Sequence, residues 1–344
     1  MSERRPTLAD VAELSGLSKT AVSLVLNDRP GSRLSPEAAD RIRAAAAQLG
    51  YKPNRAAQSL RLGKTRSVGF ISDEVTLTRY ASGMIKGVLD AARELDHTVL
   101  IAETEGDISG VGPAIEAMLD RRVDGLIVGL MGARLVDLPR PSQDVPLVIV
   151  NGRAPAGYPS ILPDEHAAGY AVGAKVIGAG HRRVGIIGEL PSIASDLRKS
   201  LTIGERFAGL DEAFADAAFE PVRVQLNAWS PAIGHDAALE MLAAHPDLTA
   251  LIAGNDNMAF GIYQALAALG RRVPDDVSVI SFDDEELASY LRPGLTTARL
   301  PYEEMARMGV EMILGQRELT DVKVPMPLIE RQSLARSGFS AIPE

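Results

Sequence analysis

Residues 7–26 read TLADVAELSGLSKTAVSLVL, and this stretch predicts two short helices joined by a tight turn. Thr7 can cap the first helix, over residues 8–14, because its hydroxyl can accept a hydrogen bond from a free backbone N–H. Gly16 provides the left-handed conformation that a turn requires. Ser18 can cap the second helix in the same way as Thr7. The stretch therefore predicts a compact pair of helices at the start of the chain.

Apolar residues recur at helical spacing in this stretch and predict a small core, formed by Leu8, Val11, Ala12, Val22, Val25 and Leu26. The small side chain of Ala12 allows the two helices to cross closely, as in a helix-turn-helix. Ser35-Pro36-Glu37 starts a third helix that runs to about Leu49 and ends at Gly50. These residues alone leave open a plain three-helix bundle with no role in DNA binding.

Charge is distributed unevenly along the chain. The net charge is −9 over 344 residues. Residues 1–66 hold twelve Lys or Arg and six Asp or Glu, whereas the remaining residues hold 24 and 39. A basic head on an acidic body is typical of a protein in which one small module contacts phosphates. A basic head that serves only solubility is the alternative that charge leaves open.

The composition is that of a globular protein with a sizeable core, since 46% of residues are hydrophobic and 24% are charged. No apolar run has the length of a membrane-spanning helix. The first residues, MSERRPTLAD, lack the apolar segment of a secretory signal. The chain has no cysteine, which excludes disulfides and thiolate metal sites and fits a reducing compartment. We therefore expect a cytoplasmic protein.

The head resembles the N-terminal signature of the lactose/galactose repressor (LacI/GalR) family. The similar residues are Thr7-Leu8-Ala9-Asp10-Val11-Ala12, Gly16-Leu17-Ser18, Ala21-Val22-Ser23 and Val25-Leu26-Asn27. A hinge-like segment follows, with Gly50-Tyr51-Lys52-Pro53-Asn54, Ala57 and Ser59-Leu60. The similarity continues through the rest of the chain. It implies a DNA-binding transcription regulator, in most cases a repressor, that is controlled by a small molecule.

The resemblance implies that the second helix enters the major groove of DNA. Lys19 and Thr20 would read base edges there. Leu60 would insert into the minor groove as an apolar wedge that kinks a base step. Around them, short polar groups and basic side chains would contact phosphates: Ser18, Ser23, Asn27, Arg55, Arg61, Lys64 and Arg66. The full set of candidate DNA-binding residues is Thr7, Ser18, Lys19, Thr20, Ser23, Leu24, Asn27, Tyr51, Asn54, Arg55, Ala57 and Leu60.

Two positions depart from the family pattern. Many family members carry an arginine where Leu24 stands, and that arginine commonly reads guanine. Leu24 cannot donate a hydrogen bond, so its contact must be apolar, for example with a thymine methyl group. Many members also carry an arginine where Gln58 stands in the hinge. These two departures change the expected operator sequence and leave the expected mode of binding unchanged.

From Ser67 onward, short apolar strands alternate with amphipathic helices. Strands are predicted at 68–71, 99–102, 126–128, 147–150, 184–187, 251–253 and 277–282, and helices at 83–94, 167–179, 205–217, 232–244 and 257–269. This alternation predicts parallel sheets with helices on both faces. The resemblance further implies a two-lobed core like that of periplasmic binding proteins. We expect the chain to cross between the lobes near residues 163–164, 293–297 and 325–327.

These expectations give a domain organisation. Residues 1–50 form an all-α helix-turn-helix domain, residues 51–66 a hinge, and residues 67–344 an effector-binding and dimerisation core. The expected lobe 1 comprises about 67–163 and 296–326. The expected lobe 2 comprises about 164–295 and 327–344.

Polar side chains follow the predicted strands, where ligands bind in open parallel sheets. They are Ser72, Asp73, Glu74, Asn151, Arg153, Asn255, Asp256, Asp283 and Asp284. Carboxylates, amides and an arginine that converge on one cleft suit a polyhydroxylated ligand. A turn at the strand end is the alternative for Asp283 and Asp284.

The strand-end rule gives Asp73 as a candidate effector-binding residue, and the family resemblance gives Asp164, Arg206, Trp229, Asn255 and Asp283. Arg206 matches the arginine that typically clamps ligand hydroxyls or a carboxylate. Trp229 matches an aromatic wall, and ordinary core packing is its alternative. A mono- or disaccharide is the expected effector, with a purine or another metabolite as the alternative.

Enzymatic activity is not expected, and neither a cofactor nor a metal ion is implied. The glycines of Gly178-Ala179-Gly180 follow a helix and precede a strand, which is the reverse of a dinucleotide-binding loop. The five histidines show no metal-ligand pairing. A sugar-binding protein or an enzyme without a DNA role is the alternative from a different functional class.

We expect the partners to be palindromic double-stranded operator DNA, the effector and a second copy of the chain, with no membrane contact. The last eleven residues carry no leucine heptads, so a homodimer is expected in place of a tetramer. Helices near 81–94 and 111–119 are expected to form the dimer contact. The alternative is that their apolar faces pack on their own sheet. The expected location is the cytoplasm, in association with the nucleoid.

Overall fold

A computed structural model describes residues 6–26, 34–51, 64–74 and 81–337. The chain divides into two compact units, residues 1–65 and residues 66–344. We call the first the head and the second the body, and we describe each by itself.

The described head consists of helices α1 (Leu8–Ser15), α2 (Lys19–Leu26) and α3 (Pro36–Leu49). At the start of α1, the Thr7 hydroxyl accepts from the Asp10 backbone N–H while Asp10 accepts from the Thr7 N–H, which forms a capping box. Gly16 ends α1 with φ +66°, and Gly50 ends α3 with φ +62°. Ser35 caps α3. The predicted helices and caps of the head are confirmed.

Residues from all three helices form the core of the head. Val11, Val22 and Ile42 are fully buried, and Ala12 and Val25 are at most 8% exposed. Leu8 and Leu26 pack against this core and are partly buried. The core therefore holds α2 against α1 and α3 and leaves the amino end of α2 at the surface.

One half of the body, which we call lobe 1, contains a parallel sheet of six strands in the order β11-β5-β4-β3-β1-β2. The strands are β1 (Ser67–Ser72), β2 (Thr98–Glu103), β3 (Leu126–Leu135), β4 (Leu147–Arg153), β5 (Ser160–Pro163) and β11 (Val322–Val324). Helices α5 (Ala81–Glu94), α6 (Val111–Asp120) and α13 (Tyr302–Ile313) belong to this lobe, together with the 3-10 helix η1 (Ile108–Gly110). The two cores of the lobe lie on opposite faces of the sheet.

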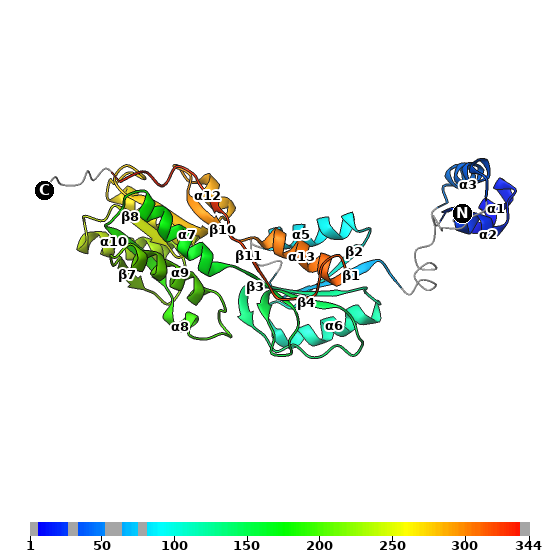
Figure 1. Ribbon diagram of the computed structural model, residues 1–344, viewed down its shortest axis with the longest axis horizontal. Coiled ribbons are helices and arrows are strands. Elements are labelled where there is room, and N and C mark those ends of the chain that lie inside the picture. The colour runs from blue at the N-terminus through cyan, green and yellow to red at the C-terminus, as the bar shows by residue number, and fades with distance from the viewer. Residues whose placement is uncertain (1–5, 27–33, 52–63, 75–80, 338–344) are drawn as a thin grey trace. The chain divides into compact units, whose positions relative to one another are not determined.

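The other half, lobe 2, has six strands in the order β12-β10-β9-β8-β6-β7, all parallel except β12. The strands are β6 (Val184–Glu189), β7 (Val222–Gln225), β8 (Ala250–Ala253), β9 (Ser278–Asp283), β10 (Thr296–Arg299) and β12 (Leu328–Ile329). The helices are α7 (Glu165–Gly178), α8 (Pro191–Ala194), α9 (Ile203–Asp216), α10 (Pro231–Ala244), α11 (Asp256–Ala268) and α12 (Glu286–Tyr290). Figure 1 labels most of these elements in the body.

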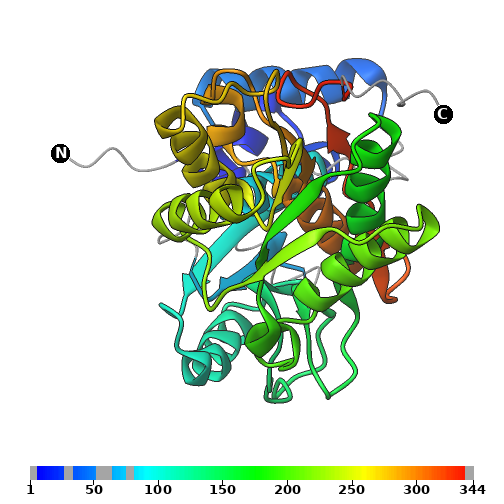
Figure 2. The ribbon, with the colours of Figure 1, turned by 90° about the vertical axis from the view of Figure 1, so that its left-hand side faces the viewer.

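Helices cover both faces of the sheet in lobe 2. In Figure 2 the green helices lie on one side of the strands and the yellow helices on the other. Helices α7 and α9 pack closely because Gly169 and Gly209 stand where they meet. A Cβ atom at Gly169 would collide with the Arg206 carbonyl oxygen, and one at Gly209 with that of His166. This close packing brings the amino ends of α7 and α9 together.

The chain crosses between the lobes three times. The first and third crossings follow β5 at Pro163 and β11 at Val324. The second crossing was expected near residues 293–297, and lobe 1 was expected to resume at 296; both expectations are wrong. Strand β10 pairs in parallel with β9, so residues 296–299 belong to lobe 2 and the chain leaves it after Arg299. This strand has four residues, and its two adjacent threonines, Thr296 and Thr297, are buried although they are polar, so the sequence shows no apolar run there.

The lobes also touch through the end of β3, which extends beyond the predicted 126–128. Leu135 N–H donates to the Leu197 carbonyl at 2.8 Å, and Leu201 N–H donates to the Ala133 carbonyl at 2.7 Å. Arg198 and Asp137 form an ion pair at 2.7 Å beside these bonds. The segment before α9 is therefore bound to lobe 1.

The helices expected to form the dimer contact differ in what they leave exposed. Helix α6 buries Val111, Ile115, Met118 and Leu119 in the core of lobe 1, so its apolar face packs on its own sheet. Helix α5 packs Met84 and Val88 on the sheet but leaves Leu89 38% exposed. Within the described residues, no helix is long and apolar enough to cross a membrane.

Candidate functional site

The amino end of α2 is the exposed part of the helix-turn-helix. Ser18 caps the helix, because its hydroxyl accepts from the Ala21 N–H at 3.2 Å. Lys19 and Thr20 are exposed in the first turn, and Ser23 and Leu24 are partly exposed one turn later. The side chains of Lys19 and Thr20 therefore lie on the surface of the head and outside its core.

Some candidate DNA-binding residues have other roles in the structure, and some cannot be placed. Thr7 is occupied in the capping box of α1, and Tyr51 packs against the head core. Arg66 was expected to contact phosphates, but its guanidinium pairs with Asp96 of the body. The remaining candidates lie outside the described residues: Asn27, Asn54, Arg55, Ala57 and Leu60.

In lobe 2, the sheet order reverses at β6, which pairs with β7 on one side and β8 on the other. Ligands bind at such switch points, beyond the carboxyl ends of the strands. Gly188 and Gly254 stand there, and the half-buried Trp229 covers both. Its Nε1 donates to the Gly188 carbonyl at 2.7 Å, and a Cβ atom at Gly254 would lie 2.7 Å from the same nitrogen. Glycines at both positions therefore make room for the indole ring.

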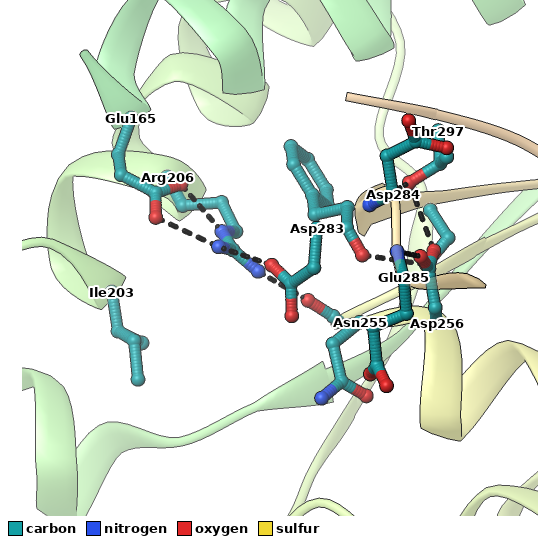
Figure 3. Close-up of polar contacts among 12 residues, drawn as sticks. Glu165, Ile203, Arg206, Asn255, Asp256, Asp283, Asp284, Glu285 and Thr297 are labelled. Carbon is teal, nitrogen blue, oxygen red and sulfur yellow. Dashed lines mark hydrogen bonds and ion pairs between the residues drawn. The ribbon is translucent and has the colours of Figure 1, made fainter. Parts of the chain in front are cut away.

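Arg206, in the first turn of α9, connects three parts of lobe 2 (Figure 3). Its Nε and Nη2 donate to the two oxygens of Glu165, both at 2.7 Å. Nη2 also donates to Asp283 Oδ1 at 3.1 Å, and Nη1 donates to the Gly254 carbonyl at 2.5 Å. The Phe282 and Trp229 rings lie 4.5 and 5.4 Å from the guanidinium carbon. This geometry fixes the guanidinium in one orientation.

Asp283 is the residue of this cluster whose charge can change near neutral pH. Burial raises the pKa of Asp283 to about 7, and the charge of Arg206 offsets only part of that effect. Burial alone would lower the pKa of Arg206, but the charges of Glu165 and Asp283 outweigh it and hold that pKa above its usual range. Arg206 therefore stays charged, whereas Asp283 can gain a proton near neutral pH.

Asp283 and Asp284 end β9 with φ values of +104° and +53°. Aspartate tolerates such left-handed backbone better than most residues. The turn directs the Asp283 carboxylate toward Arg206, at 3.1 Å. It directs the Asp284 carboxylate toward Arg299 and Arg331, both at 2.7 Å. Asp283 and Asp284 therefore form a turn at the strand end and also belong to the candidate site.

Two further candidates in lobe 2 cap helices. Asn255 Oδ1 accepts from the Met258 N–H at 2.9 Å at the start of α11, and the Asn255 side chain lies next to Asp283 in Figure 3. Asp164 accepts from the Ala167 N–H at 3.2 Å at the start of α7. Next to Asn255, burial and then the charge of Asp283 raise the pKa of Asp256. The Asp256 carboxylate accepts from Thr297 Oγ1 and from the Glu285 N–H.

In lobe 1, the Asp73 carboxylate is bound by other residues of the same lobe. Its carboxylate accepts from the Met131 N–H at 3.0 Å and pairs with Arg134 at 2.7 Å, and the residue is 2% exposed. Asn151 is likewise buried, donating to the Leu130 carbonyl at 2.9 Å. Both residues therefore stabilise the carboxyl edge of the lobe 1 sheet.

Tyr302, at the start of α13, interacts with the candidate residues of both lobes. Its hydroxyl donates to the Met131 carbonyl at 2.9 Å. Burial raises the pKa of Tyr302, and the charges of Asp283, Glu165 and Asp73 add to this effect. Tyr302 thus shares an electrostatic environment with the candidates of both lobes.

A cavity of about 300 Å³ opens between the lobes beside Asp283. Lobe 1 contributes Ser82, Gly83, Tyr302 and Glu303 to its lining. Lobe 2 and the crossing segment contribute Asp283, Asp284, Glu285, Glu286, Leu287, Arg299 and Leu300. The described residues contain no group of three or more potential metal ligands. The lining of the cavity is rich in carboxylates, which can accept hydrogen bonds from a ligand.

The structure brings together Arg206, Trp229, Asn255 and Asp283, whereas the hydrogen-bond partners of Asp73 lie in lobe 1. Sequence reasoning missed Glu165, Arg134 and Tyr302. Glu165 directly follows Asp164, but an acid in the first turn of a helix is ordinary. Its pairing with Arg206, 41 positions away, leaves no signal in one sequence.

Comparison with known proteins identifies both parts of the chain. Residues 7–54 match the lacI family of bacterial regulatory proteins, and residues 174–334 match a periplasmic binding protein-like domain. The chain is 30% identical to the HTH-type transcriptional repressor PurR of Serratia proteamaculans, over 97% of this chain and 98% of that protein. It is 29% identical to the ribose operon repressor of Escherichia coli K12, over 95% and 96%.

Solved structures have the same fold. The lac repressor dimer bound to operator and the anti-inducer ONPF superposes with a TM-score of 0.73 at 24% identity, covering 96% of this chain and 100% of that one. The helix-turn-helix head and the two-lobed body with parallel sheets are both confirmed. The chain belongs to the lacI family of bacterial regulatory proteins.

Proposed function

We propose that this regulator represses transcription by binding a palindromic operator as a homodimer, and that a small molecule bound between the lobes controls this binding. One observation carries the proposal: a single chain contains both a helix-turn-helix with an exposed α2 amino end and a two-lobed body with a cavity. Asp283 lines that cavity and bonds to Arg206. The family and the repressor relatives support the same function.

For DNA, we propose that Lys19 and Thr20 read base edges and that Ser18 and Ser23 contact phosphates, with Leu24 making apolar contacts. Thr7, Asn27, Tyr51, Asn54, Arg55, Ala57 and Leu60 complete the proposed set. A two-fold operator requires two heads, and the exposed Leu89 on α5 and Ile101 on β2 supply apolar surface for a homodimer contact.

For the effector, we propose a mono- or disaccharide bound by Asp283 and Asn255, with Arg206 and Trp229 behind them and Asp164 near the crossing. The Asp283 carboxylate can accept from sugar hydroxyls, and the indole offers an apolar face. The ribose operon repressor among the relatives supports a sugar. The PurR relative supports a purine as the second candidate.

The proposed control is a shift between two arrangements of the lobes. An effector that binds one arrangement better than the other changes its population and, by linkage, the affinity for operator. We propose that the effector releases DNA. In this function the protein has no catalytic role and needs no cofactor, and it acts in the cytoplasm on the nucleoid.

Electrophoretic mobility shift with fragments of the source genome tests the proposal. The expected result is a specific complex with a palindromic fragment, weakened by raised salt and by one member of a panel of sugars and purines. Arg206→Ala and Asp283→Ala are expected to retain operator binding and lose the response. A protein that binds no fragment specifically would overturn the proposal. Footprinting of a single half-site would overturn its dimeric form.

A further inference from the structure

The guanidinium of Arg206 has no free edge for an anionic ligand. It has five N–H donors, and the Nε–Nη2 edge, the one suited to a carboxylate, is bound by both oxygens of Glu165. Nη1 donates to the Gly254 carbonyl, and Nη2 also reaches Asp283, so four of the five N–H donors have a protein acceptor and both edges of the guanidinium are engaged. The Arg206 and Glu165 side chains are each 3% exposed. A ligand carboxylate or phosphate would have to displace Glu165 to reach Arg206.

The charges around the cavity also disfavour an anion. Two carboxylates, Glu165 and Asp283, surround the single charge of Arg206. The cavity lining adds Asp284, Glu285, Glu286 and Glu303 and one cation, Arg299. Arg331 and Lys86, outside the lining, pair with Asp284 and Glu303, and the acids still outnumber the cations. Like charges repel strongly where burial reduces the effective dielectric constant. Donors such as hydroxyl and ammonium groups, in contrast, can bond to Asp283.

We propose that Glu165 determines the charge of the effector: by occupying Arg206, it excludes sugar acids and sugar phosphates and leaves a site for neutral or amine-bearing sugars. The inference rests on the proposed function, in which the effector binds beside Asp283. It makes Glu165 a positioning residue, because it acts on the ligand through Arg206.

A purely structural role for Glu165 has a different consequence. Replacing Glu165 would then lower stability and leave the preference between neutral and anionic ligands unchanged. The preference itself, measured as a ratio of dissociation constants, therefore separates the two roles.

The test uses calorimetric titration of the full chain, wild type and Glu165→Gln, with D-glucose, D-glucosamine, D-glucuronate and D-ribose 5-phosphate. Acetate, titrated at constant ionic strength with chloride as the balancing anion, serves as a minimal probe of the freed guanidinium. Glu165→Gln is expected to bind acetate and the anionic sugars roughly ten- to a hundredfold more tightly than the wild type. Any binding of the neutral or aminated sugars should be tighter than that of their anionic counterparts in the wild type.

Glu205→Gln is the matched control. Glu205 also lies in the first turn of α9, but it pairs with Lys323 at the surface. This variant should bind every probe as the wild type does. Should Glu165→Gln fail to fold, Glu165→Met carries the same test with an apolar side chain of similar length.

Two results would overturn the inference. One is equal anion affinity in the wild type and the Glu165 variants, including no binding by either. The other is a wild type that binds D-glucuronate more tightly than D-glucose. The proposed function fails separately, through loss of specific operator binding in the mobility shift, so a gain of anion affinity without any operator complex would support the role of Glu165 alone.

Discussion

Arg331 Nη2 lies 2.7 Å from Asp284 Oδ1, and this ion pair ties the chain beyond the third crossing to the end of β9. Arg299, at the end of β10, approaches the other oxygen of Asp284 at 2.7 Å. The Asp284 side chain is 5% exposed, so it neutralises two arginines from a largely buried position. The residue beside the proposed effector contact therefore anchors two of the segments that connect the lobes.

We predict that Asp284→Asn lowers the free energy of unfolding by about 2 kcal/mol, because two arginines lose a buried counter-charge. Asparagine tolerates the φ of +53°, so the change tests the charge and not the backbone. Urea denaturation measures the effect. Asp275→Asn, which removes an exposed partner of Arg272, should cost less than about 0.5 kcal/mol. Equal costs for both variants would contradict the prediction.

Stability should fall as pH rises from 5 to 7. The pKa of Asp283 is raised to about 7 by burial, so between about pH 4 and pH 7 the native state binds a proton that the unfolded state has released. The stabilisation is complete below the unfolded pKa and is lost as pH passes the folded pKa. We expect Asp283→Asn to reduce this slope by about 1 kcal/mol per pH unit.

Chemical denaturation at several pH values measures the slope. Asp276→Asn is the control, because Arg272 holds the pKa of that exposed carboxylate below its usual range and it does not titrate between pH 5 and 7. An Asp283→Asn protein with the wild-type slope would show that Asp283 is already ionised at pH 5.

Gly209→Ala should destabilise the body by about 3 kcal/mol or more, because the added Cβ collides with the His166 backbone and forces α7 away from α9. The same displacement should weaken the pairing of Glu165 with Arg206. Gly178→Ala in α7 is the matched control, since an added Cβ there meets nothing within 4 Å. It should be neutral or stabilise by up to about 1 kcal/mol. The thermal unfolding midpoints of both variants test this prediction, and equal midpoints would contradict it.

Leu60→Ala should weaken specific operator binding about tenfold or more and change binding to random DNA much less. The proposed wedge gains free energy only where a base step kinks easily. Fluorescence anisotropy on operator and on scrambled duplexes measures the ratio. Leu14→Ala, on the exposed side of α1, should leave both affinities unchanged. Equal losses on the two duplexes would assign Leu60 to hinge packing.

The local parts of this protein could be predicted from its sequence. The caps at Thr7, Ser18 and Ser35 and the left-handed Gly16 and Gly50 depend on neighbouring backbone groups, so their residue types are visible in a single sequence. The longer buried strands, such as β1 and β9, could be recognised because continuous apolar runs are needed to bury both faces of a sheet. Strands β5, β7, β10, β11 and β12 were missed, and each has four residues or fewer. The equally short β8 was predicted because all four of its residues are apolar.

The assembly of the site depends on contacts between residues that are distant in the sequence. The strand-end rule correctly selected the edges where polar groups gather, but side chains at one edge can bond to protein or to ligand. Asp73 pairs with Arg134, and Arg206 pairs with Glu165, and nothing in a single sequence indicates either partner. The pairing of Arg206 with Glu165 depends on how far apart α7 and α9 lie, which Gly169 and Gly209 set through a contact between residues about forty positions apart. The head helices and the sheets could be predicted from sequence alone because they follow from local periodicity and capping, and the family could be recognised from its motif residues. The charge of the binding site depended on long-range packing, because two buried side chains pair only where the fold brings their backbones together.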